Sequence, residues 1–315
     1  MACPHVSSVR GVRLYWTVHP ANPMLKPPDL DPRSVRLQFS RRAVRFAGVD
    51  FLYREIEQRM FERLEMIRVA PGRILDVGCG LGGGLEKLAG RFPSARLLGI
   101  DAADGMLRHN VFAPGAQVDT LGRRLRGWAG RLWGASTEAP AAGRVGLVAA
   151  DAARLPVGDR QAGLLWSNLA WHWFDDPPAV AAEWHRVLEP GGLLMFSAFG
   201  VDTLRELRDL GAQLPELPDL HDVGDLLGQT AFVDPVMDVE RLTISYADPQ
   251  RLLDEWHGMG GNASRDRGRG LRTPRQRQRW IDAIESLRGN DGRIAISVEI
   301  VQAHAWRGEP TVGAD

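Results

Sequence analysis

Apolar residues follow two alternating patterns along most of the chain, beginning at residue 73. Short apolar runs, typical of buried strands, alternate with segments in which apolar residues recur every three or four positions, as on one face of a helix. This alternation predicts βαβ units and a parallel sheet. The predicted strands lie near 73–77, 96–100, 145–150, 162–167, 192–198, 236–246 and 293–303, and the predicted helices near 178–188, 202–209 and 221–228.

These elements predict an α/β fold built on one mostly parallel sheet. Seven strands are expected, the last one antiparallel, with helices on both faces. We expect a single domain over 34–306, with the helical segment 34–68 folded over the sheet as a lid. Residues 1–33 are expected to be a disordered tail, because they are rich in proline and almost free of acid; an organelle transit peptide is the alternative. Residues 307–315 are expected to form a second tail.

The segment 113–143 interrupts the alternation between the second and third strands of the predicted sheet. It sets Leu121, Leu125, Trp128 and Leu132 at helical spacing against several arginines. We expect an amphipathic surface helix packed on its own domain. A helix that faces lipid or a partner protein is the alternative.

Composition excludes several classes of protein. The net charge is zero, so nothing global indicates binding to nucleic acid or to a membrane surface. No apolar run approaches the roughly 18 residues of a membrane span. The only cysteines, Cys3 and Cys79, cannot form a disulfide framework, which favours a reducing cytoplasm. The eight histidines are scattered, so no metal site is predicted. The oligomeric state is not predicted.

The stretch ILDVGCGLGGG carries the main chemical signal. Gly78, Gly80 and Gly83 match the spacing of a dinucleotide-binding turn, and Gly82 adds to it. Glycine suits a backbone that turns sharply and approaches a ligand closely. Asp76 distinguishes two ligands, because a carboxylate there repels a pyrophosphate but attracts the ammonium group of S-adenosylmethionine (SAM). The turn therefore favours SAM over a dinucleotide.

Two further strands end in acidic residues. Asp101 follows the second strand of the predicted sheet, at a distance suited to binding both ribose hydroxyls of a nucleoside. Met106 is expected to cover one face of the adenine, and Asp151 with the amide of Ala152 to meet the adenine edge. The alternative is that each aspartate only caps a helix. Three such aspartates around a glycine turn predict SAM binding.

With these motifs joined to its later blocks, the sequence resembles the malonyl-acyl-carrier-protein O-methyltransferases of biotin synthesis. The resemblance implies the class I SAM-methyltransferase (Rossmann-like) fold, SAM as cofactor and malonyl-acyl carrier protein as methyl acceptor. The blocks that carry it are WSNLAWHW (Trp166–Trp173), Val187–Arg208, His221–Tyr246, the glycine-arginine stretch 260–271 and HAW (His304–Trp306).

Some positions depart from the family pattern. Phe46 and Ala47 stand where the family usually has Tyr-Asp, and Gln302 replaces a usual tyrosine. His172 is more like a mitochondrial relative that acts in respiratory complex I assembly and is linked to arginine hydroxylation. The alternatives are therefore a diverged paralogue that acts as a non-catalytic, SAM-binding assembly factor, or one that modifies a protein arginine.

Several residues are candidates for the chemistry. A carboxylate acceptor is already ionised at neutral pH, so no strong base is required. The guanidinium group of an arginine is able to bind both oxygens of such a carboxylate. Arg208 is the first candidate for that clamp and Arg205 the second. Asn168 and His172 follow the fourth strand, at the edge where substrates bind, and Asn168 is also a candidate cofactor contact. Capping or packing is the alternative for both.

A basic stretch between residues 265 and 279 is a candidate docking surface. Acyl carrier proteins are strongly acidic, so Arg265, Arg267, Arg269 and Arg272 are expected to attract one. A solvated surface loop is the alternative. RNA binding through the same stretch is a weaker hypothesis, and no nucleic-acid partner is expected.

Overall fold

The computed structural model describes residues 5–15, 30–113, 144–212, 214–259 and 273–308. Apart from its first residue, the predicted amphipathic segment 113–143 lies outside the described residues, as do the four arginines proposed for docking, Arg265, Arg267, Arg269 and Arg272.

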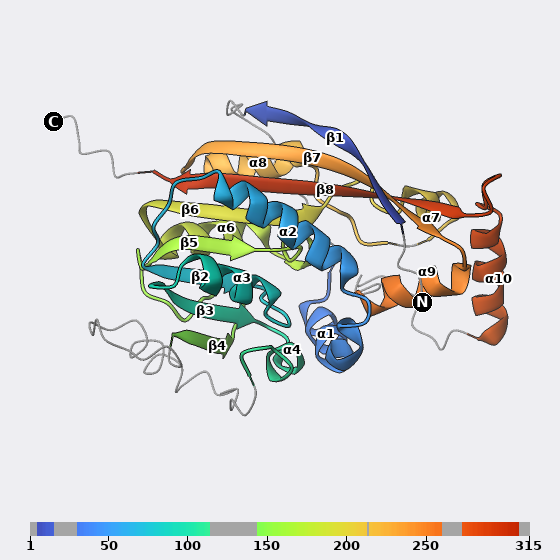
Figure 1. Ribbon diagram of the computed structural model, residues 1–315, viewed down its shortest axis with the longest axis horizontal. Helices are drawn as coiled ribbons and strands as arrows, with labels where there is room; N and C mark the ends of the chain where they lie inside the picture. Colours follow the sequence, from blue (N-terminus) through green and yellow to red (C-terminus); the bar gives the residue numbers. More distant parts are fainter. Residues whose placement is uncertain (1–4, 16–29, 114–143, 213, 260–272, 309–315) are drawn as a thin grey trace.

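The described residues form one mixed sheet with helices on both sides (Figure 1). The sheet has eight strands in the order β1-β7-β8-β6-β5-β2-β3-β4. Strands β4, β3, β2, β5 and β6 are mutually parallel, and β8 lies antiparallel between β6 and β7. The strands are β1 (His5–Tyr15), β2 (Arg73–Val77), β3 (Arg96–Asp101), β4 (Val145–Ala149), β5 (Ala162–Ser167), β6 (Leu188–Phe199), β7 (Phe232–Tyr246) and β8 (Ile294–Arg307).

The seven predicted strands and the antiparallel last strand are confirmed. The expectation that residues 1–33 form a disordered tail is wrong for His5–Tyr15, because these residues form strand β1. Strand β1 pairs antiparallel with β7, from His5 opposite Ser245 to Tyr15 opposite Val236. The prolines that suggested disorder lie beyond residue 15, and the outer edge of β7 offers unpaired backbone groups to an added strand.

Five of the nine described α-helices begin at a side-chain cap. Asp31, Asp176, Asp248 and Thr273 each accept a backbone N–H at a helix start, and a proline follows in the first turn. Asp219 caps α8 in the same way without a proline. The helices are α1 (Pro32–Phe46), α2 (Phe51–Glu65), α3 (Gly83–Arg91), α4 (Asp104–Arg108), α6 (Pro177–Val187), α7 (Arg205–Asp209), α8 (Leu220–Gln229), α9 (Pro249–Gly258) and α10 (Pro274–Glu285), with a 3-10 turn, η2, at Trp171–Trp173.

The core has two layers because successive strand residues face opposite sides of the sheet. Leu75 packs in the cluster that contains Trp184 of α6, while its neighbour Ile74 packs with Met60 of α2 and Leu85 of α3. All of these side chains are fully or almost fully buried. Helices therefore cover both faces of the sheet, as predicted.

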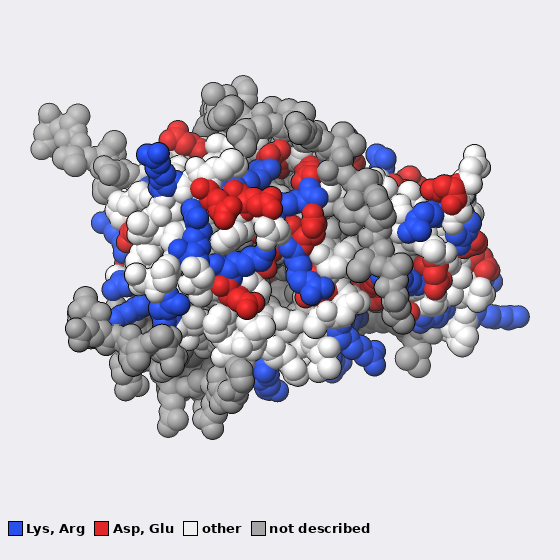
Figure 2. Space-filling view, in the orientation of Figure 1, with Lys and Arg blue, Asp and Glu red and all other residues white. Residues whose placement is uncertain are grey.

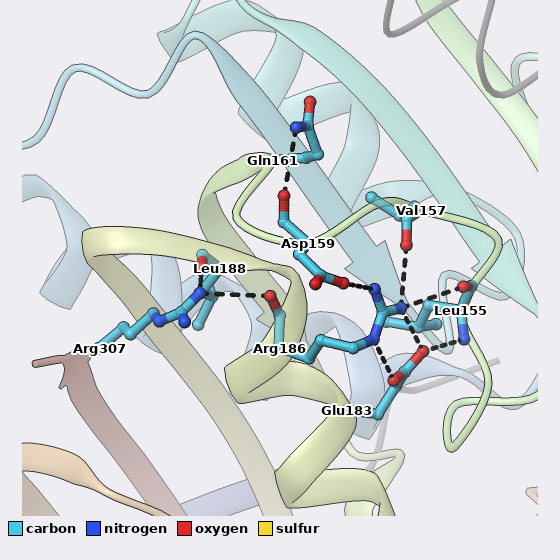
Figure 3. A network of polar contacts seen from close by, with 8 residues as sticks. All are labelled: Leu155, Val157, Asp159, Gln161, Glu183, Arg186, Leu188 and Arg307. Carbon is cyan, nitrogen blue, oxygen red and sulfur yellow. Dashed lines mark hydrogen bonds and ion pairs between the residues drawn. The ribbon is translucent and has the colours of Figure 1, made fainter. Parts of the chain in front are cut away.

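Arg186 of α6 joins the loop after β4 to the rest of the domain (Figure 3). Its guanidinium group donates to Glu183 at 2.7 Å, to Asp159 at 2.6 Å and to the carbonyl oxygen of Val157 at 2.9 Å. Arg307 of β8 donates in turn to the Arg186 carbonyl oxygen at 3.2 Å. Several charge-assisted hydrogen bonds thus hold this loop, which begins at the carboxyl end of β4.

In the part of the chain that the structure describes, no helix is both long and apolar enough to cross a membrane. Nor do those residues include a group of three or more histidine, cysteine, aspartate or glutamate side chains placed to hold a metal ion.

Candidate active site

The turn after β2 has a backbone that suits glycine at three positions. Gly78, Gly80 and Gly82 have φ values of 77°, 49° and 91°, in the left-handed region that disfavours a side chain. A methyl group on Gly78 would lie 2.5 Å from the Ala170 side chain, and one on Gly82 would lie 2.4 Å from Asn110 Oδ1. A methyl on Gly80 would meet no atom within 4 Å. The turn is thus tightly packed on one side and open at Gly80, as a ligand cradle requires.

Asp76 is a buried carboxylate at the start of this turn. Only 3% of the residue is exposed, and its Oδ2 has no hydrogen-bond partner among the described residues. Burial raises the pKa of Asp76 well above its ordinary value, and the nearby charges of Glu57 and Asp101 add to the shift. An ammonium group placed here would satisfy the oxygen and restore the ionised form. Asp76 therefore fits the amino-acid end of SAM.

Glu57 of α2 is a second buried carboxylate at the same place, and sequence reasoning missed it. A methyl group on Gly83 would lie 2.7 Å from Glu57 Oε2, so the side chain rests on the first turn of α3. Burial raises the pKa of Glu57 to about 7, against the opposing effect of the Lys87 charge. One feature of the sequence could have indicated this residue: Glu57 is an acidic residue in the apolar stripe of α2, between Ile56 and Met60.

Asp101 lies beside the glycine turn, as predicted. The backbone N–H of Gly80 donates to its Oδ2 at 2.9 Å, and that of Ala103 donates to its Oδ1 at 2.7 Å. Burial raises the pKa of Asp101 to about 6, although these two hydrogen bonds favour the ionised form. Each oxygen retains a lone pair, so the carboxylate is able to accept two ribose hydroxyls.

Helix α1 packs directly on α4 and covers Met106. The Ser40 hydroxyl donates to Asp104 at 2.9 Å and accepts the Gly105 N–H at 3.3 Å. A methyl group on Gly105 would lie 2.2 Å from the Ser40 carbonyl oxygen, so only glycine permits this approach. Met106 is buried against Phe46 of α1. Met106, which the sequence predicts to cover one face of the adenine, thus lies under this helix and is only 2% exposed.

Asp151 and Ala152 follow β4 at the same edge of the sheet as Asp101. The N–H of Ala150 donates to the Asp101 carbonyl oxygen at 3.2 Å, which places this segment next to the end of β3. The Asp151 side chain is exposed and accepts the Ala153 N–H at 3.0 Å. Ala152 is largely buried in the core. The carboxylate is thus free on its solvent side to meet a ligand.

The two polar groups of Asn168 are both bonded to protein. Its amide nitrogen donates to the Tyr53 carbonyl oxygen at 2.9 Å, and its amide oxygen accepts from the Ser197 hydroxyl at 2.8 Å. The same hydroxyl accepts the Leu169 N–H at 2.8 Å. Asn168 therefore ties α2 to the carboxyl ends of β5 and β6. One N–H and one lone pair of its amide group remain for the predicted contact with substrate or cofactor.

His172 is buried and neutral. The Phe199 N–H donates to its Nδ1 at 3.2 Å, which leaves the proton of the ring on Nε2. Nε2 has no hydrogen-bond partner among the described residues. Burial lowers the pKa of His172 to about 3. With Nδ1 occupied and Nε2 protonated, the ring is expected to stay neutral at neutral pH.

Aromatic side chains connect helices α1 and α2 to the segments at the ends of β5 and β6. Tyr53 contacts Phe46 with ring centroids 5.0 Å apart and Phe199 at 6.3 Å, and its hydroxyl donates to the Met259 carbonyl oxygen at 3.2 Å. Sequence reasoning did not predict this cluster. Its members, which we call the aromatic cluster, are Phe39, Phe46, Tyr53, Trp173, Phe199 and Trp256.

The two candidate clamp arginines differ in what they already bind. Arg205 forms an ion pair with Glu206 at 3.3 Å. Arg208 donates to the Val201 carbonyl oxygen and forms no ion pair with any described residue. Partial burial lowers the pKa of Arg208. The guanidinium group of Arg208 is thus the one still available to a substrate carboxylate.

The fold is shared with solved structures of low sequence identity. The YcgJ protein of Bacillus subtilis matches with a TM-score of 0.51 and 17% identity, over 82% of this chain and 100% of that one. A candidate methyltransferase from Bacillus halodurans matches with a TM-score of 0.52 and 16% identity, over 79% of this chain and 97% of that one. These likenesses support the fold alone.

The sequence comparisons are more specific. Residues 75–196 match the model of the methyltransferase domain. The malonyl-acyl-carrier-protein O-methyltransferase of Gallionella capsiferriformans is 37% identical, over 91% of this chain and 94% of its own length. That of Laribacter hongkongensis is 39% identical, over 88% and 90%. With its methyltransferase fold and its glycine turn flanked by Asp76 and Asp101, the chain belongs to the malonyl-acyl-carrier-protein O-methyltransferase family.

Proposed function

We propose that the protein methylates the free carboxylate of malonyl-acyl carrier protein at the start of biotin synthesis, in the cytoplasm. The observation that carries the proposal is the near full-length identity of 37–39% to relatives named for that reaction. Esterification removes the terminal charge, so chain-elongation enzymes that expect an apolar end would accept the product. When bound, SAM would supply an electrophilic methyl group: the malonyl carboxylate oxygen would form the new O–C bond as the S–C bond breaks, with S-adenosylhomocysteine as the leaving group.

The residues present fit SAM. The unpartnered, buried Oδ2 of Asp76 suits the ammonium group, and Asp101 suits the ribose. Asp151 with the amide of Ala152 suits the adenine edge. The open space beside Gly80 permits close approach to the backbone of the turn. Two carboxylates with raised pKa values also suit a cation better than an anionic pyrophosphate.

On the acceptor side, the protein is proposed to orient and desolvate a nucleophile that is already ionised. A carboxylate with an ordinary pKa near 4 needs no general base, which agrees with a neutral His172. The aromatic cluster excludes water, and Arg208 holds the carboxylate through its fork of N–H donors. Holding the two reacting groups together in the right orientation accounts for a large part of the rate enhancement.

The test is methyl transfer with purified components. Malonyl-acyl carrier protein incubated with SAM and the protein should gain one methyl group by mass spectrometry. Acetyl-acyl carrier protein, which lacks the terminal carboxylate, is the matched control and should stay unchanged. If calorimetry shows SAM binding and the malonyl carrier remains unmodified, the proposal is wrong. Complementation of a biotin auxotroph tests the same activity in cells.

A further inference from the structure

Helix α1 has an exposed basic face with an apolar centre. Its fifteen residues include five arginines and no acid. Leu37 and Val44 remain 47% and 72% exposed on the same helix, although both are large apolar residues. Because they are seven residues apart, they lie on the same side of the helix, with Arg41 between them. We call this surface the α1 arginine face; it comprises Arg33, Arg36, Leu37, Arg41, Val44 and Arg45, all exposed.

The arginines of this face have no ion-pair partner among the described residues. Within the described parts of the chain, none of the four guanidinium groups on the face pairs with a carboxylate. The neighbouring helix α2 is different, because Arg59 pairs with Glu55 and Glu240, and Arg63 pairs with Asp238. Figure 2 shows acidic and basic side chains intermixed where Figure 1 draws α2, whereas basic side chains stand on largely uncharged surface where it draws α1.

The inner side of α1 belongs to the candidate active site. Phe39 and Phe46 contribute to the aromatic cluster, and Ser40 bonds to Asp104 of α4, close to the proposed nucleoside end of the cofactor site. One helix therefore carries the proposed acceptor wall on its inner side. On its outer side it carries cations that pair with no carboxylate of the described residues. A partner bound to the outer side would stand next to the aromatic cluster, which its cargo must reach.

We propose that the α1 arginine face is the docking surface for the acidic carrier protein that presents the malonyl group. The proposal rests on the proposed function. A carrier domain of strongly negative charge complements the four exposed arginines of this face, whose forks bind carboxylates and the phosphate of the carrier's arm. Leu37 and Val44 supply the apolar centre that a protein interface needs within a polar rim. The arginines steer the encounter, and the apolar pair holds the complex.

The experiment compares a carrier-bound substrate with a free one. In the double variant Arg36→Glu/Arg41→Glu, kcat/KM for malonyl-acyl carrier protein is expected to fall about 10-fold or more, since steering and rim contacts are lost. Turnover of malonyl-pantetheine, which has no protein to dock, should not change. The matched control reverses Arg68 and Arg160, two exposed arginines that precede β2 and β5 at the opposite edge of the sheet, and should leave both substrates unaffected.

Folding and charge are checked separately. The neutral variant Arg36→Gln/Arg41→Gln should show a smaller loss in the same direction, and both variants should keep the parent's affinity for SAM. Equal kinetics of parent and reversed variant on malonyl-acyl carrier protein would overturn the docking proposal, as would a loss shared by the Arg68/Arg160 control. If the parent methylates neither malonyl-acyl carrier protein nor malonyl-pantetheine, it is the proposed function that fails.

Discussion

Glu57 and Asp76 meet beside Gly84, although one lies on helix α2 and the other on strand β2. A methyl group on Gly84 would lie 3.0 Å from Glu57 Oε1 and 3.0 Å from Asp76 Oδ2. Both carboxylates are at least nine-tenths buried. Two buried like charges are costly unless one is protonated or a cation lies between them. The amino-acid end of the proposed SAM site is therefore sensitive to pH and to cations.

Replacing Glu57 with glutamine is expected to stabilise the protein without ligand at pH 8. The pKa of Glu57 is about 7 in the folded protein against an ordinary 4.5, so the folded state holds its proton more tightly. Stability is therefore lost as pH rises from about 4.5 to about 7, by on the order of 3 kcal/mol. Denaturant unfolding from pH 4 to 8 measures this loss, which Glu57→Gln should reduce. Glu65→Gln, at an exposed position of the same helix, is the control; an identical pH dependence in parent and Glu57→Gln would contradict the assignment.

Replacing Asp101 with alanine is expected to weaken SAM binding by about 10- to 150-fold, or about 1.5–3 kcal/mol. The carboxylate is held by the N–H groups of Gly80 and Ala103, so the variant loses both the ribose acceptor and the anchor of the turn. Isothermal calorimetry measures the affinity. Asp209→Ala, at an exposed position of α7, should bind SAM like the parent. Unchanged affinity in Asp101→Ala would exclude Asp101 from the cofactor site.

His172 is expected to be required for packing and not for proton transfer. Its pKa of about 3 keeps the ring neutral, so kcat/KM should show no inflection from His172 between pH 6 and 8. Glutamine is able to accept the Phe199 N–H through its side-chain oxygen, whereas leucine leaves that buried N–H unpaired, at a cost of about 1–3 kcal/mol. His172→Gln should therefore retain turnover, and His172→Leu should lose stability. A pH inflection that disappears in His172→Gln would instead indicate a titrating, catalytic histidine.

Arg208→Gln is expected to lower kcat/KM for malonyl-acyl carrier protein about 100-fold or more, because a charge-assisted clamp on the carboxylate is lost. SAM affinity should not change. The control is Arg205→Gln on the same helix, since Arg205 is already paired with Glu206. Steady-state kinetics with both substrates separate the two effects. Equal losses in the two variants would show that helix α7 matters and that the clamp does not.

Local sequence was sufficient for seven of the eight strands that the structure describes, for the glycine turn and for the family. Side chains return to the same face every two residues along a strand and every 3.6 residues along a helix. The periodicity of the apolar residues therefore predicted the elements. A strand that ends in Asp76, followed by glycines that need positive φ, is likewise a local pattern, and parallel strands bring Asp76 and Asp101 to the same edge of the sheet.

Only the tertiary structure brought together residues that are far apart in the chain. Glu57 meets Asp76 because α2 packs across the start of α3, and Asn168 is bonded to Tyr53 and Ser197 because three elements converge there. Strand β1 forms because the edge of β7 is open to pairing. No local pattern encodes such partners, since burial and charge at one residue depend on which segment packs against it. The sequence by itself thus determined seven strands of the sheet, the glycine turn and the family. The packing of α1 and α2 decided which charges are buried and which lie on the surface.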